Sequence, residues 1–178
     1  MEEQAKVPLM KPALIYGLIA GFVGIVVNVI FYVMGLSLET WVGFVSMAIG
    51  IIVLVYLLRA YRNEHLGGFA TYGQLILMVL LIAVIGSIIS TIYTYLLYTV
   101  IDPELIEKVK IMTEERLMNN PRISESMYDS VLEKMEKRMT VGKMTMNAFI
   151  FGTIGTFIIG LIIAAFLKKE KTPEEMAA

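Results

Sequence analysis

Residues 72–101, YGQLILMVLLIAVIGSIISTIYTYLLYTVI, decide the fold class of this chain. The stretch contains more than a dozen leucine, isoleucine and valine residues and no Asp, Glu, Lys, Arg or His. As an α-helix it would be about 40 Å long, which exceeds the roughly 30 Å apolar core of a bilayer. Each aliphatic side chain favours insertion near the bilayer centre by about 0.3–0.6 kcal/mol. The stretch therefore predicts a transmembrane helix that tilts or extends beyond the bilayer at one end.

Three further stretches have the same character, at about residues 12–34, 41–61 and 146–167. Each meets or approaches the length of about 20 residues that a membrane-spanning helix needs. Between Pro12 and Leu58 the only acidic or basic side chain is Glu39, so these helices have no polar face to present to water. We therefore predict an all-α, polytopic integral membrane protein, a bundle of four transmembrane helices forming a single membrane domain over residues 1–178.

Residues 102–143 differ from the four apolar stretches because they contain many charged side chains among the apolar ones. Asp102-Pro103-Glu104 combines an N-cap residue, an N1 proline and an acidic first turn, which predicts a helix start. Asn119-Asn120-Pro121 predicts the end of that helix. A second helix is predicted from about Ser124 or Ser126 to Thr140. We expect an extramembrane amphipathic helical hairpin between spans three and four.

Two patterns support this hairpin. The second helix has one apolar face at helical spacing, formed by Met127, Tyr128, Val131, Leu132, Met135 and Met139. Two oppositely charged pairs have i,i+4 spacing, Glu104–Lys108 and Glu133–Lys137. Such a pair stabilises a helix by about 0.3 kcal/mol.

The basic residues on the two sides of this topology are nearly equal in number. With the N-terminus in the cytoplasm, the cytoplasmic side has seven basic residues and the 102–143 segment has eight. The first span favours one orientation, because Lys6 and Lys11 precede it and no basic residue follows it before the second span. Since the first helix usually dominates orientation, we expect both termini in the cytoplasm and the hairpin outside.

The composition argues against several classes of function. The net charge of −1 provides no field for nucleic acid. With no cysteine and one histidine, disulfides, thiolate metal sites and histidine clusters are excluded. No acidic or basic side chain lies well inside a span, as ion-coupled transporters usually require. No catalytic motif is present. We therefore expect no enzyme, no catalytic, cofactor-binding or metal-binding residue, and no cofactor.

Two features have both a functional and an ordinary interpretation. His65 lies in the loop between spans two and three. This loop is either a ligand site or an ordinary turn that its glycines allow, and we weigh the turn at about four to one. The methionines of the hairpin region are either packing residues or thioether ligands for Cu(I). They are Met112, Met118, Met127, Met135, Met139, Met144 and Met146. Packing is the more common role of methionine, and we give Cu(I) binding about one chance in ten.

Small residues recur at four-residue spacing within two spans. Gly17 and Gly21 form a GxxxG pattern in the first span, and Gly152, Thr156, Gly160 and Ala164 line one face of the fourth. Such faces allow helices to approach closely, either within one chain or between two copies. Packing within the chain is the default expectation.

Several stretches of the sequence resemble one known family. They are Lys11 to Gly17, Tyr61 to Gln74 (YRNEHLGGFATYGQ), Tyr98 to Pro103, and the charged helical insert before the last span. On these residues the chain resembles a bacterial membrane family catalogued as domain of unknown function 4199, over nearly its whole length. The resemblance implies a small inner-membrane protein of Gram-negative bacteria. It carries over no catalytic or ligand residue.

Two functional hypotheses follow from these observations. The leading one is a non-enzymatic membrane protein that acts through protein interactions, with the hairpin as its docking element. Its partners would be the lipid bilayer and a membrane protein or a second copy of the chain. The alternative is a membrane protein that handles a small molecule or Cu(I) through the methionine-rich hairpin.

Overall fold

The computed structural model describes residues 9–121 and 124–170. They form six α-helices and two π-helical turns, and they contain no β-strand. The elements are α1 (Met10–Val33), α2 (Thr40–Ala60), η1 (Tyr61–His65), α3 (Tyr72–Leu96), η2 (Leu97–Ile101), α4 (Leu105–Met118), α5 (Glu125–Arg138) and α6 (Val141–Leu167). This order confirms the predicted all-α fold class.

Four helical segments are long and apolar enough to cross a membrane: Met10–Val33, Thr40–His65, Tyr72–Ile101 and Val141–Leu167. They agree with the predicted spans to within two residues, except that the second continues to His65 rather than residue 61 and the last starts earlier. The final helix begins at Val141 rather than near residue 146, because the backbone N–H of Met144 already bonds to the carbonyl of Thr140. Large apolar side chains on these helices face outward, and Phe166 is 85% exposed. Lipid is the solvent that suits such a surface.

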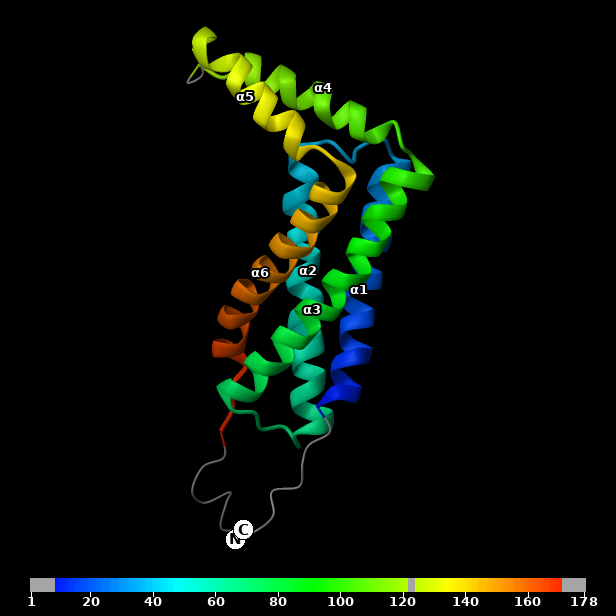
Figure 1. The fold of residues 1–178 in the computed structure, drawn as a ribbon. Helices are drawn as coiled ribbons and strands as arrows, with labels where there is room; N and C mark the ends of the chain where they lie inside the picture. Colours follow the sequence, from blue (N-terminus) through cyan, green and yellow to red (C-terminus); the bar gives the residue numbers. More distant parts are fainter. Residues whose placement is uncertain (1–8, 122–123, 171–178) are drawn as a thin grey trace, which may run out of the picture. The chain divides into compact units, whose positions relative to one another are not determined.

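The chain divides into two compact units. The first contains the described residues up to Ser90 together with those from Phe151 onward, and the second is Thr91–Ile150. In the first unit, α1, α2 and parts of α3 and α6 contribute to one buried core (Figure 1). Its most deeply buried side chains include Leu57, Leu58 and Leu75. That residues 1–178 form a single domain stays a prediction.

Glycines set the spacing between helices in the first unit. A Cβ added to Gly17 would lie 2.6 Å from Cβ of Ile85, so α1 and α3 are in contact there. A Cβ on Gly160 would lie 2.1 Å from Cγ1 of Val79, so α6 and α3 are equally close. Both small-residue faces are therefore used for packing within the chain, which was the default expectation.

In the second unit, α4 and α5 lie against each other (Figure 1). The predicted start of α4 is too early: the helix begins at Leu105, with Glu104 rather than Asp102 at the N-cap position. Asp102 still accepts the backbone N–H of Leu105 through its Oδ1, at 3.1 Å. The predicted Glu104–Lys108 pair was wrong in its acidic partner: the amino group of Lys108 lies 3.7 Å from Asp102 Oδ2. Helical side chains tilt toward the N-terminus, so Lys108 reaches back to the carboxylate that caps the helix.

Candidate functional site

The connection between α2 and α3 is a tight polar loop at one end of the first unit. The α-helix widens into the π-helical turn η1, after which the backbone N–H of Gly68 bonds to the carbonyl of Arg62 at 2.9 Å. Gly67 and Gly68 have φ angles of 63° and 88°. Residues with a Cβ rarely adopt such angles, which explains the glycine pair at this reversal. A π-helical turn often marks a functional position.

His65 lies between two tyrosine rings. Its ring centroid is 6.1 Å from that of Tyr16, edge-on, and 5.9 Å from that of Tyr61. The hydroxyl of Tyr16 donates a hydrogen bond to Glu64 Oε2 at 3.3 Å. These contacts join α1 to the end of α2. Only 7% of Tyr16 and 2% of Tyr61 is exposed, so both rings pack inside the protein.

The last turn of α6 is fixed by residues of the same loop. An α-helix leaves its last four carbonyls without partners inside the helix. The Nη1 of Arg62 donates to one of them, the carbonyl of Leu167, at 3.0 Å. Just beyond, Ala70 and Lys169 exchange two backbone hydrogen bonds of 2.8 and 3.0 Å. We call these contacts of Arg62 and Ala70 the α6 tie.

The chemistry available in this loop is limited. Glu64 and His65 are exposed, and within residues 9–121 and 124–170 no group of three or more His, Asp or Glu side chains could hold a metal ion. The Nζ of Lys169 lies 4.9 Å from the ring centroid of Phe69, a cation–π contact. The loop therefore joins the ends of α1, α2 and α6, and its side chains hold these helix ends in place.

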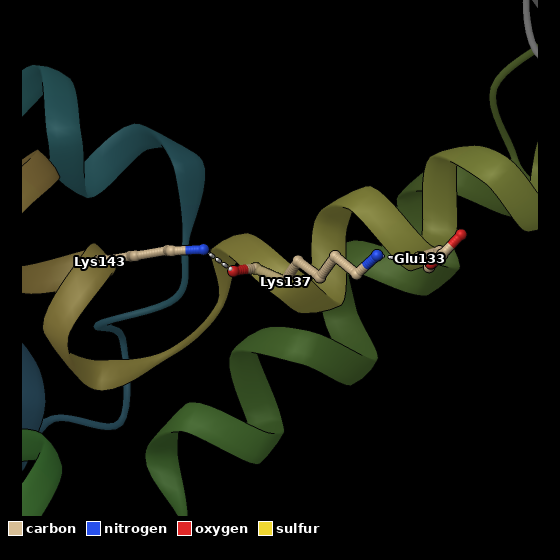
Figure 2. A network of polar contacts seen from close by, with 3 residues as sticks. All are labelled: Glu133, Lys137 and Lys143. Carbon is tan, nitrogen blue, oxygen red and sulfur yellow. Dashed lines mark hydrogen bonds and ion pairs between the residues drawn. The ribbon is translucent and has the colours of Figure 1, made fainter.

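The second candidate region is the pair α4 and α5. Lys110 pairs with Glu107 at 3.3 Å in α4, and Lys137 pairs with Glu133 at 2.6 Å in α5, the latter as predicted. Figure 2 shows that the backbone carbonyl of Lys137 also accepts a hydrogen bond of 2.6 Å from the amino group of Lys143. This bond connects the end of α5 to the first turn of α6.

Apolar side chains on this helix pair differ in exposure. Of the six residues predicted for the apolar face of α5, five are partly buried and Met127 is 51% exposed. On α4, Met118 is 63% exposed and Ile111 is also exposed. The seven methionines are spread over α4, α5, the end of α5 and the start of α6. Nothing in this placement favours thioether ligation over packing.

Comparison with known proteins assigns the family. A family model described as "Protein of unknown function (DUF4199)" matches residues 15–169. The chain belongs to this family. No curated protein and no solved structure gave a significant match. For this DUF4199 member the matched region begins within the Lys11–Gly17 stretch and includes Tyr16, the whole α2–α3 loop and Lys169, so the family assignment covers the α6 tie.

Sequence reasoning missed the roles of three residues of this site in the DUF4199 chain. Tyr16 and Tyr61 stand near the ends of predicted spans, but both are buried in the core of the first unit and contact His65. Arg62 resembled an ordinary charged flank, whereas its guanidinium completes α6, which begins far along the chain. The adjacent glycines indicated the turn correctly, but no local signal identified the carbonyl that Arg62 reaches.

Proposed function

We propose that this DUF4199 protein is a non-enzymatic, multi-pass protein of the bacterial inner membrane that acts by binding another integral membrane protein. In this proposal α4 and α5 form an extramembrane docking hairpin. The observation that carries it is the exposure of Ile111, Met118 and Met127 on two helices that are otherwise rich in charge. Exposed apolar side chains with charged neighbours are typical of protein interaction surfaces.

The composition of the hairpin supports a docking role. Its basic and acidic side chains are nearly equal in number, eight and nine between Thr91 and Ile150, and several pair with each other. A surface with mixed charge has little long-range attraction for anions. Methionine adapts its shape to different partners. Both properties favour a protein partner over a charged small molecule.

The orientation belongs to the same proposal: both termini in the cytoplasm, and the hairpin on the opposite side. We expect a cysteine introduced at Ser130, which is exposed on α5, to react with a membrane-impermeant maleimide in cells whose outer membrane is permeabilised. A cysteine at the exposed Asn63 should be protected until the inner membrane is opened. The chain has no cysteine of its own, so each label reports one position. Labelling at position 63 with protection at position 130 would mean that the protein has the opposite orientation.

The docking role predicts that removing the hairpin changes the proteins recovered with the chain. After cross-linking in cells and extraction in a gentle detergent, we expect a defined membrane-protein partner with the full chain. It should be lost when residues 104–140 are replaced by a short flexible linker. The milder variant M118S/M127S should weaken binding of the partner by about thirtyfold, because two exposed apolar contacts are each worth on the order of 1 kcal/mol at an interface.

A matched control is F44L, which changes an outward-facing side chain of α2 and should leave the cross-link unchanged. If the same partner proteins were recovered with and without residues 104–140, the docking role of the hairpin would be contradicted. Cross-links between copies of the chain alone would also contradict the proposal, because the hairpin would then serve self-association.

A further inference from the structure

The start of α1 and the ends of α2 and α6 lie at one end of the first unit (Figure 1), and basic residues occur at each of these helix ends. They are Lys11, Arg59, Arg62, Lys168 and Lys169, which we call the basic end. The structure itself brings the helix ends together, since Tyr16 bonds to Glu64 and Arg62 bonds to the carbonyl of Leu167. Cations from helices far apart in sequence therefore lie at one rim.

Two of these five cations are already engaged. Arg62 completes the α6 tie, and the amino group of Lys169 lies over the ring of Phe69. The other three, Lys11, Arg59 and Lys168, are exposed. Among the residues that the structure describes, no carboxylate lies within ion-pairing distance of any of them.

Two acidic side chains lie at this end within the described part of the chain. They are Glu170 and Glu64, and the carboxylate of Glu64 accepts a hydrogen bond from the hydroxyl of Tyr16. The segment 91–150 is different, because nine acidic residues accompany its eight basic ones. Within the described residues, the basic end therefore has five basic and two acidic side chains beside the apolar helix surface.

We infer that the basic end binds the phosphate headgroups of anionic phospholipids, with Arg59 and Lys168 as the main ligands and Lys11 as a third. Three observations carry the inference: the cations are exposed, no carboxylate of the described residues pairs with them, and they lie where apolar helices end. Acyl chains can follow the outward apolar faces of α2 and α6, where Tyr56 and Phe166 are exposed. Arginine and lysine at this level attract anionic headgroups.

The position of Arg59 suits this role. It lies in the last turn of α2, three residues before Arg62 of η1. Arg62 contacts the carbonyl of Leu167, and Lys168 is the next residue. Arg59 and Lys168 are thus close in sequence to the two residues that the Arg62–Leu167 hydrogen bond joins. A phosphate between them would receive charged hydrogen bonds from both, which are stronger than neutral ones.

The test is native mass spectrometry of the purified full chain in detergent, titrated with dioleoyl-phosphatidylglycerol or dioleoyl-phosphatidylcholine. We expect the phosphatidylglycerol to bind more tightly, and R59Q/K168Q to lose at least tenfold in affinity for it. Each basic residue near a headgroup is worth about fivefold. The charge-preserving variant R59K/K168R should retain binding. Both changed positions are exposed, so thermal unfolding in detergent should be unaffected.

The matched control is K134Q/R138Q, which removes the same charge from exposed positions of α5 and should leave the affinity unchanged. An equal loss in both double variants would overturn the inference, because the effect would then follow total charge. Competition by millimolar inorganic phosphate would also overturn it, because the ligand would then be a soluble anion. If the unchanged protein bound phosphatidylglycerol and phosphatidylcholine equally well, the inference would also be overturned.

Discussion

Replacing Gly160 by alanine is expected to destabilise the first unit by about 1–3 kcal/mol, the range for overpacking a close-packed interior. The new Cβ would lie 2.1 Å from Cγ1 of Val79 and 3.1 Å from its Cβ. Valine cannot move away by a change of χ1, because both of its γ-carbons and its Cβ face the glycine. Alanine favours helix over glycine by about 1 kcal/mol, but this gain is smaller than the cost of separating α6 from α3.

The measurement is unfolding by sodium dodecyl sulfate in mixed micelles, followed by maleimide labelling of a cysteine placed at the buried Ala164. The matched control is G155A on the same helix, where an added Cβ meets nothing within 4 Å. This variant should be unchanged or slightly more stable. In a V79A background the G160A substitution should cost at least about 1 kcal/mol less, since neighbouring sites couple by that amount. An equal cost in both backgrounds would contradict direct contact between the two residues.

Removing the donor of the α6 tie is expected to have the second largest effect. The variant R62M keeps the length and apolar stem of the side chain but leaves the carbonyl of Leu167 without its partner. A partly buried hydrogen bond from a charged donor contributes about 1–2 kcal/mol. We expect the end of α6 to open more often, and the amide of Lys169, which bonds to Ala70, to exchange its hydrogen about tenfold faster.

Hydrogen exchange measured by mass spectrometry on peptides covering residues 160–170 would show the change. R59M is the control. Arg59 is exposed, so this substitution should leave hydrogen exchange at Lys169 unchanged. Unchanged exchange in R62M would mean that the Ala70–Lys169 bridge holds the helix end without Arg62.

The fold class could be predicted from the sequence because long apolar stretches have few alternatives. The stretch at 72–101 is too long and too apolar for a soluble core, so its helix and its bounds were predicted correctly. Helix signals within the charged segment were also local: α4 ends at Met118, next to the asparagines that predicted its end. The start of α6 was placed too late because Lys143 was taken as a flank, whereas it lies in the first turn.

The candidate site could be predicted only in part. The glycines after His65 indicated a reversal, which their positive φ angles confirm. The partners of that loop could not be predicted, because Arg62 and Leu167 are brought together by the packing of α2 and α6. In the same way, the sequence showed that Gly17 and Gly160 suit close approach, but only the packed helices show that Ile85 and Val79 are the neighbours.

The α6 tie also constrains the order in which the protein can be completed. Ribosomes make α6 after the other three spans, and N-terminal segments enter the membrane first. Until Leu167 and Lys169 have been synthesised, Arg62 and the backbone of Ala70 have no partners for the bonds seen here. The α6 tie therefore forms after α1, α2 and α3 have been made. A stop codon just before Leu167 would leave α6 almost complete but without the residues that bond to Arg62 and Ala70.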